Sequence, residues 1–248
     1  MLRLRAVPVD EAPARGTPPP DEWLALVNRQ SLAVRLLAAT IHDVNNILQV
    51  MSGAAEVLAL DPTPATVAKR TTAIVSHSVA ATSALHALTA FVKASSSAAD
   101  GARPLPVARA VVAARQYAIR KARLAVTVEG DEGAMCAMAS HRLHQVILNL
   151  VLNAEHALTG AAEGRIRIEV AAGDRVRVVV ADNGPGLAPP AADAAFAWPP
   201  MPGGAAGALG LGLRVSRALV ADAGGTLTLA RDGDGGLRAV LDVPRHFA

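Results

Sequence analysis

Two apolar helical seams, separated by a proline-containing turn, constrain the fold of this 248-residue chain most strongly. Between residues 22 and 60, apolar side chains alternate at four- and three-residue spacing, which is typical of a bundle helix. The seam consists of Leu37, Ile41, Val44, Leu48, Met51, Ala55 and Leu58. The run Asp61-Pro62-Thr63-Pro64 ends the helix, because proline cannot continue it. A comparable seam follows at Val67, Ile74, Ala81, Leu85, Leu88 and Val92.

The two helices are expected to form an antiparallel hairpin over residues 22–95. A single hairpin exposes its apolar stripe, and pairing with a second copy into a four-helix bundle buries that stripe most economically. The sequence therefore predicts a homodimer. Residues 1–21 hold five prolines and no periodic pattern, and are predicted to form a flexible tail.

The character of the chain changes after residues 96–106, which have the composition of a linker. Helical patterns at 107–122 and 140–158 are interleaved with strand patterns at 165–170, 175–180, 226–229 and 237–243. The glycine-rich segment between the last two strands predicts a β-hairpin. The predicted fold class is thus α+β: the helical hairpin, then an α/β sandwich over 107–248 with its helices on one side of a mixed sheet.

Composition excludes several classes of protein. With 52% hydrophobic and 18% charged residues the chain is not disordered, and a single cysteine, Cys136, rules out a disulfide framework or a cysteine metal site. Aromatic residues make up 2%, which disfavours a nucleic-acid reader that stacks bases. The net charge of +3 and the pI near 9.6 come from scattered cations, so no nucleic-acid partner is expected.

No membrane insertion is expected either. Residues 71–92 carry no charge, but nine of them are Ser, Thr or His, which a lipid-facing helix would not tolerate cheaply. The first residues lack a signal peptide because Pro8, Asp10 and Glu11 interrupt any apolar stretch. The expected location is the cytoplasm.

A polar stripe runs along the predicted helix at 140–158, where Gln145, Asn149, Asn153 and His156 recur at four-, four- and three-residue spacing. Asparagine is unfavourable inside helices, so two in one stripe suggest a function other than stability. Neutral amide oxygens suit a Mg²⁺ ion whose charge is balanced mainly by phosphates. The alternative is an ordinary solvated helix face.

Two glycine-rich segments follow. The apolar strand that ends in Ala181 runs into Asp182, Gly184 and Gly186, where a protected carboxylate could accept a hydrogen bond from the amine of adenine and glycines let a flat base approach. An ordinary turn after a strand is the alternative. Residues 207–213 then open a helix, and such loops present free N–H groups to phosphate.

In the first helix, His42 lies beside the seam and should face solvent at the edge of the bundle. Asp43 follows it, and Asn46 lies one turn further on the same face. A neutral imidazole with a free nitrogen can act as a nucleophile, and a neighbouring carboxylate can take or orient its proton. Four other histidines are interpreted as structural: His77, His86, His141 and His144.

These segments, in this order, resemble the sensor histidine kinases of two-component systems. Residues 42–46 look like their phosphoacceptor H box and residues 144–154 like the N box, while residues 182–186 and 210–213 resemble the two glycine boxes. The likeness covers residues 28–246. It implies a dimerisation and phosphotransfer hairpin followed by a Bergerat-type ATP-binding domain.

The resemblance also implies roles for individual residues. Asn149 and Asn153 would hold Mg²⁺ and phosphates, and Asp182 would read adenine. The nucleotide pocket would be shaped by Gly184, Gly186, Gly210, Leu211 and Gly212. His42 would attack the γ-phosphate of ATP with Asp43 as proton acceptor or orienter, and the phosphoryl group would pass to an aspartate of a response regulator. Asn46 matches the position that orients water for dephosphorylating that regulator, and an upstream sensor protein could supply the signal.

The segment 187–206 departs from the family pattern, since Trp198 is followed by prolines where cations or hydroxyls usually contact phosphate. Arg214 or His156 is the expected substitute cation. Three functions therefore compete: an active autokinase, a histidine phosphotransferase with a degenerate ATP-binding domain, and a non-catalytic dimeric scaffold. The autokinase is favoured because the adenine aspartate, both asparagines and the acceptor histidine are present.

Overall fold

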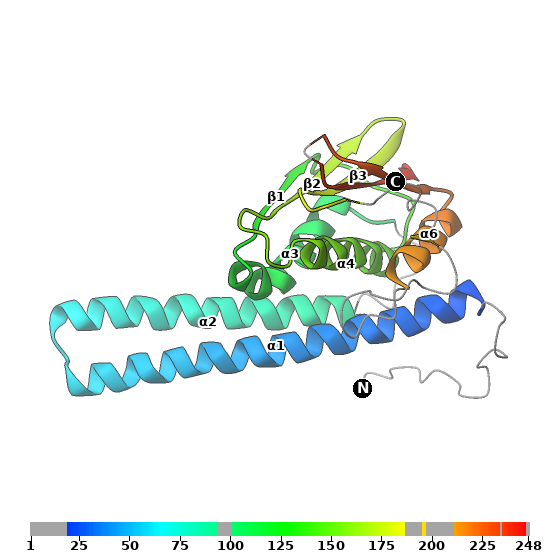
Figure 1. Cartoon of the computed structure of the whole chain (residues 1–248). Helices are drawn as coiled ribbons and strands as arrows, with labels where there is room; N and C mark the ends of the chain where they lie inside the picture. Colours follow the sequence, from blue (N-terminus) through cyan, green and yellow to red (C-terminus); the bar gives the residue numbers. More distant parts are fainter. Residues whose placement is uncertain (1–18, 94–100, 187–194, 197–210, 234, 247–248) are drawn as a thin grey trace.

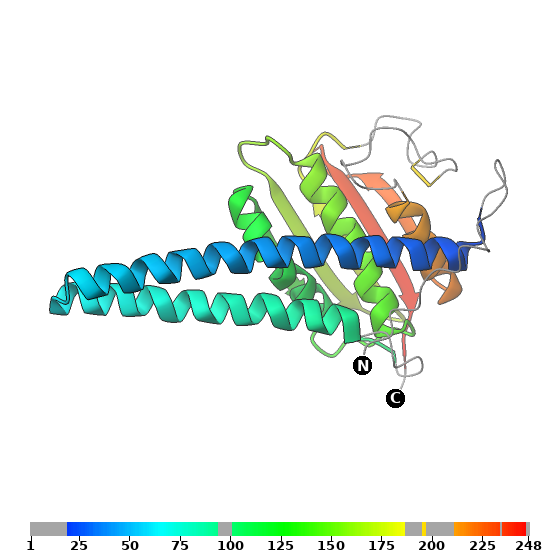
Figure 2. The ribbon, with the colours of Figure 1, turned by 90° about the horizontal axis from the view of Figure 1, so that it is seen from below.

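The computed structural model describes residues 19–93, 101–186, 195–196, 211–233 and 235–246. A long helical hairpin, α1 (Asp21–Leu60) and α2 (Pro64–Lys93), lies along the helical side of an α+β domain (Figure 1). Pro64 begins α2, so the proline-containing turn ends one helix and starts the next as predicted. The tip of the hairpin extends well beyond the domain (Figures 1 and 2).

The α+β domain contains three helices and a five-stranded sheet among its described residues. Its elements are α3 (Pro104–Lys121), β1 (Ala125–Gly130), α4 (Ser140–Ala157), β2 (Arg165–Ala172), β3 (Arg175–Asp182), α6 (Gly212–Asp222), β4 (Thr226–Arg231) and β5 (Leu237–Pro244). The strand order is β1-β2-β3-β5-β4, with β1 parallel to β2 and the other pairs antiparallel. The predicted mixed sheet with helices on one side is confirmed (Figure 1).

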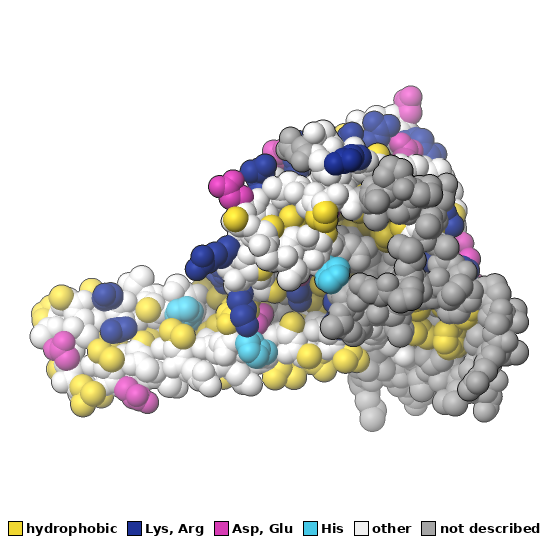
Figure 3. Space-filling view, viewed as in Figure 1, with side chains coloured by type: hydrophobic (Ala, Val, Ile, Leu, Met, Phe, Trp, Pro, Cys, Tyr) yellow, Lys and Arg dark blue, Asp and Glu magenta, His cyan; other side chains and the backbone are white. Residues whose placement is uncertain are grey.

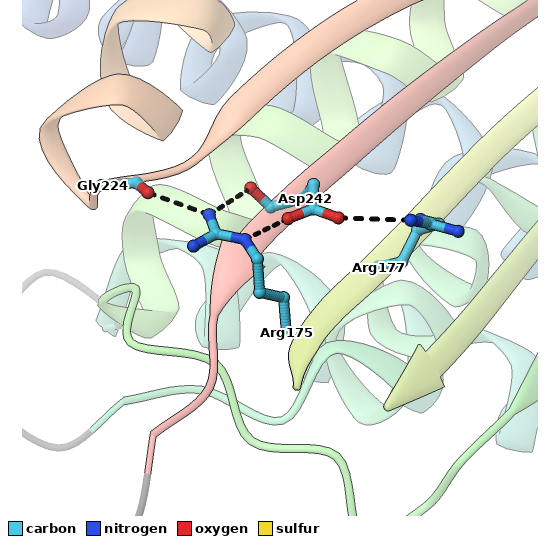
Figure 4. A network of polar contacts seen from close by, with 4 residues as sticks. All are labelled: Arg175, Arg177, Gly224 and Asp242. Carbon is cyan, nitrogen blue, oxygen red and sulfur yellow. Dashed lines mark hydrogen bonds and ion pairs between the residues drawn. The ribbon is translucent and has the colours of Figure 1, made fainter. Parts of the chain in front are cut away.

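Alternation in the sequence explains how the sheet is built. In β2, the exposed Arg165 and Arg167 alternate with buried Ile166 and Ile168, so one face packs on the helices and the other meets solvent. On the outer face, Arg175 of β3 bonds to the Asp242 side chain and backbone of β5 and to the Gly224 carbonyl, and Arg177 contacts the same carboxylate (Figure 4). These contacts tie neighbouring strands to the turn after α6.

The first half of α1 packs on the α+β domain, which the sequence patterns did not indicate. Leu24, Leu32 and Leu36 are buried in one continuous core with the inner residues of α4 and the sheet. Together with Asn28 they recur every four residues, a stripe distinct from the predicted seam. Seen from below, α1 crosses α4 and α6 (Figure 2). The hairpin and the second domain therefore share a core instead of folding as separate units.

The predicted bundle seam stays largely exposed in the single chain. Leu37, Ile41 and Leu48 are 46%, 53% and 50% exposed, whereas Thr40, Asp43, Ile47 and Ala54 form the buried stripe of this part of α1. Hydrophobic side chains lie along the hairpin (Figure 3). Helix α1 is long and apolar enough to cross a membrane. Buried helices of globular proteins meet the same criterion of length and composition. The absence of membrane insertion thus stays a prediction.

Element boundaries differ slightly from the predicted ones. Helix α3 begins at Pro104, inside the segment 96–106 expected to be a linker, and Ala102 is already buried and paired with Cys136. Proline fits the first helical turn because its missing N–H has no partner there. Strand β1 was not predicted; its short run, half buried on one face only, carries little periodic signal. The expected tail lies mainly outside the described residues.

Candidate active site

His42 is exposed on α1, with 59% of its side chain accessible, as expected for a residue beside the seam. Its Nδ1 lies 3.1 Å from the Asn46 side-chain nitrogen and 3.6 Å from Asp43 Oδ1. An amide nitrogen only donates, so in this arrangement Nδ1 accepts and a neutral ring carries its hydrogen on Nε2. The structure thus brings together the three residues predicted at this site.

Asp43 is buried where α1 meets the second domain. Burial raises the pKa of its carboxyl above the ordinary value, while His42, Arg115 and Lys121 pull it downward by smaller amounts. A carboxylate with a raised pKa is a better proton acceptor than an exposed aspartate. Asp43 therefore has the position and the basicity to exchange a proton with His42.

A residue of the second domain completes this group. Asn46 donates a hydrogen bond of 2.8 Å to the Tyr117 hydroxyl on α3, and the Tyr117 ring lies edge-on to His42 with centroids 6.1 Å apart. Close by, Arg115 and Glu155 form a two-bonded ion pair between α3 and α4. His42 therefore lies beside α3, with Asn46 making the polar contact between the two helices.

The second part of the site lies at the end of β3. Asp182 is buried, and its Oδ1 accepts hydrogen bonds from the backbone N–H groups of Gly184 (2.9 Å) and Leu237 (3.4 Å). Burial raises the pKa of this carboxyl, and the two N–H donors oppose the shift. Both recorded donors take Oδ1, and no donor to Oδ2 is recorded among the described residues.

Two glycines are needed for this geometry. Gly186 has a φ of +68°, and a Cβ there would lie 2.9 Å from the carbonyl oxygen of Gly235. A Cβ on Gly184 would lie 2.9 Å from Asp182 Oδ1 and 3.2 Å from the methyl of Ala157. Glycine thus lets the chain pass close to the carboxylate, as the motif indicated.

The first half of the polar stripe of α4, Gln145 and Asn149, is buried and not a solvated face. Asn149 is 4% exposed, and its Nδ2 lies within 3.2 Å of the Asn28 side chain, the Gly212 carbonyl and the Ser216 hydroxyl. Its Oδ1 accepts a bond of 3.3 Å from Asn28 Nδ2. Gln145 donates to Asn28 Oδ1 (2.8 Å) and to the Ala25 carbonyl (2.9 Å). The N-terminal part of α1 thus contacts this stripe directly.

The remaining predicted residues are placed differently. Asn153 is half buried, with no hydrogen bond recorded to the described part of the chain, and His156 is exposed. Leu211 is buried just before α6, and Gly212 touches Asn149. Arg214, the expected substitute cation, bonds to Asp21 of α1 at 3.0 Å. Gly210, Trp198 and most of segment 187–206 lie outside the described residues, although Phe196 is buried beneath Arg217.

Sequence patterns missed Asn28, Asp21 and Tyr117. The signal for Asn28 was present, since a lone asparagine interrupts an apolar stripe of four-residue spacing. Asp21 and Tyr117 had no such signal, because only the packing of α1 against α3 and α6 gives them partners.

Comparisons with known protein sequences match part of this chain. Residues 138–246 match the family described as histidine kinase-, DNA gyrase B-, and HSP90-like ATPases. A 101-residue segment is 39% identical to the C4-dicarboxylate transport sensor protein DctB of Rhizobium meliloti, covering 40% of this chain and 16% of that protein. A 106-residue segment is 42% identical to the two-component sensor PprA of Pseudomonas aeruginosa, covering 40% of this chain and 11% of that protein. The matches thus span a small part of these longer relatives.

Solved structures show similar folds. The catalytic domain of histidine kinase ThkA has a TM-score of 0.51 at 25% identity and covers 56% of this chain and 91% of its own. Full-length ShkA in complex with AMPPNP has a TM-score of 0.53 at 21% identity and covers 86% of this chain and 46% of its own. The second likeness, which concerns the fold alone, extends over the helical hairpin.

Proposed function

We propose that this chain is a sensor histidine kinase with an ATP-binding domain of the family just described, and that it phosphorylates His42 from Mg-ATP. The observation that carries the proposal is the group around His42: an exposed imidazole next to a buried carboxylate of raised pKa, on the same chain as the Asp182 pocket. The phosphoryl group would then pass to an aspartate of a response regulator, the partner that two-component sensors imply.

The chemistry assigns a role to each nitrogen of His42. Nε2 attacks the γ-phosphorus, the bond from phosphorus to the bridging oxygen breaks, and ADP leaves with that electron pair. Attack requires the hydrogen on Nδ1, and the Asp43 carboxylate, 3.6 Å away, is the acceptor that can hold it there. The contact from Asn46 to Nδ1 holds the opposite tautomer, so it must break before transfer.

The nucleotide pocket is proposed to lie between α4, the end of β3 and the start of α6. Asp182 Oδ2 would accept from the adenine amine, with Gly184, Gly186, Gly210, Leu211 and Gly212 shaping the walls. A bound Mg²⁺ would neutralise phosphate charge, and the amide oxygens of Asn149 and Asn153 are the donors that fit it. Asn153 has no recorded hydrogen bond to the described residues, whereas Asn149 Oδ1 is paired with Asn28. Arg214 and His156 remain the proposed cations for phosphate.

The exposed seam supports a homodimer. Leu37, Ile41 and Leu48 would be buried when a second hairpin completes a four-helix bundle. Asn46 would orient water for dephosphorylating the regulator once released from Tyr117. A cytoplasmic location and an upstream sensor as partner complete the proposal.

Incubation with γ-labelled ATP and Mg²⁺ tests this function. Acid-labile, alkali-stable label is expected on the wild-type chain and on His86→Ala, a control in an exposed histidine of α2, and is expected to vanish in His42→Ala. Absence of label, with acceptance of phosphoryl from a phosphorylated regulator, would favour the phosphotransferase alternative. Failure of both reactions would favour the scaffold.

A further inference from the structure

The N-terminal turns of α1 contact two residues assigned to the phosphate side of the nucleotide site. Asn28 pairs with Asn149 of α4, and Asp21 pairs with Arg214 of α6. Asp21 and Asn28 are seven residues apart, so they lie on the same face of α1, about two turns from each other. One face of one helix therefore reaches both positions.

Each of these two contacts occupies a group that would otherwise bind the metal ion or a phosphate of the nucleotide. An amide binds a cation only through its oxygen, and Asn149 Oδ1 is covered by the N–H of Asn28 at 3.3 Å. Arginine binds carboxylate and phosphate in the same way, and Arg214 holds the Asp21 carboxylate at 3.0 Å. Asn28 thus covers the proposed metal ligand, and Asp21 stands in for a phosphate oxygen.

The contact is built into the core. Leu24, between the two polar residues, is fully buried, and Leu32 follows on the same stripe. Gln145 adds bonds to Asn28 and to the Ala25 carbonyl, so the buried amides pair with one another. Such a network has discrete bound and released arrangements, because each partner left alone in a buried position is costly.

We propose that residues 21–28 of α1 act as an internal competitor of Mg-ATP, with Asn28 and Asp21 covering the phosphate side until α1 is released. This inference rests on the proposed nucleotide site. His42 lies 14 residues beyond Asn28, about 21 Å along the helix, so the docked α1 also keeps its own histidine away from the phosphate side. Release of α1 therefore uncovers the metal ligand and frees the histidine in one movement.

Nucleotide affinity of the full chain tests the proposal. We expect Asn28→Ala to tighten the apparent Kd for a non-hydrolysable ATP analogue with Mg²⁺ at least about fivefold, because the docked state then loses the donor to Asn149 Oδ1 and the acceptor shared by Asn149 and Gln145. Asp21→Asn, at a more exposed pair, should tighten it about twofold. Asn45→Ala, a matched change at an exposed position of α1, should leave the Kd unchanged.

Hydrogen exchange provides a readout that needs no catalysis. The backbone amides of residues 22–36 should exchange faster in Asn28→Ala than in the wild type without nucleotide, and faster in the wild type after the analogue and Mg²⁺ are added. One outcome overturns the competitor proposal alone: the wild type binds the analogue, Asp182→Asn abolishes that binding, and Asn28→Ala leaves the Kd unchanged or weakens binding. The proposed kinase function would then still stand. No binding in any variant, Asn28→Ala included, overturns both.

Discussion

The side-chain nitrogen of Asn46 donates to the hydroxyl of Tyr117 at 2.8 Å, joining α1 to α3, the first helix of the second domain. The same nitrogen lies 3.1 Å from His42 Nδ1. Domain docking and the tautomer of His42 are therefore linked through one amide group.

A double-mutant cycle on this pair should reveal the coupling. Asn46→Ala and Tyr117→Phe should each lower the free energy of unfolding by about 1 kcal/mol, and the double variant should lose little more than either single one. Urea unfolding measures all four proteins. Because Tyr117 is the only tyrosine, its ring gives a single set of NMR signals, which Asn46→Ala should shift. Additive losses would show that the two side chains are not coupled.

Asp182→Asn should separate stability from binding. The raised pKa of Asp182 means that its ionised form lowers the stability of the folded chain. At low pH the Asp182 carboxyl is protonated in both the folded and the unfolded chain, and its contribution to stability is fully present. That contribution is lost as pH rises from the ordinary pKa of 3.8 through the raised pKa of the folded chain. At pH 7 the asparagine variant should be as stable as the wild type or more so, by thermal unfolding.

The same variant should bind nucleotide at least about tenfold more weakly. Its Oδ1 can still accept from Gly184 and Leu237, which leaves an N–H donor at the position where Oδ2 is proposed to accept from the adenine amine. Two donors then oppose each other. Calorimetric titration with the Mg²⁺-bound ATP analogue checks this, and unchanged affinity would remove Asp182 from the pocket.

Glu155→Ala should destabilise the chain by about 3 kcal/mol, since it leaves a charged Arg115 without its partner in a largely buried position. Arg35 lies near enough to repel Arg115 once Glu155 is gone, and its own pKa is already lowered, mainly by burial. Arg115→Met combined with Glu155→Leu should cost much less, because no lone charge remains. Chemical unfolding compares them; equal losses would contradict this account.

Leu37→Lys should convert a homodimer into a monomer. A lysine at this exposed seam position would place two charges in the apolar centre of a four-helix bundle, while the single chain can solvate it. Sedimentation equilibrium measures the mass. Gln49→Lys, at an exposed α1 position off the seam, should leave the dimer intact. A wild-type chain that sediments as a monomer would contradict the homodimer directly.

Much of the second domain could be predicted from its sequence. The alternation in β2 and β3, the glycines after Asp182 and the apolar face of α4 are local patterns, and the structure places the elements close to the predicted bounds. Asp182 follows a buried strand, so its burial was implied by the strand itself. Strand β1 was missed because it is short and has no fully buried residue, so its own pattern is weak. Its pairing with β2 holds it in the sheet.

The sequence by itself determined the helical hairpin, the mixed sheet and the residue types around His42 and Asp182, because spacing along one element sets which side chains share a face. Only the tertiary structure decided what faces Asn149, Arg214 and Asn46. Their partners Asn28, Asp21 and Tyr117 belong to other elements. Contacts between residues distant in the chain depend on how whole faces pack, and a buried amide on one helix reveals nothing of its partner until the two helices meet.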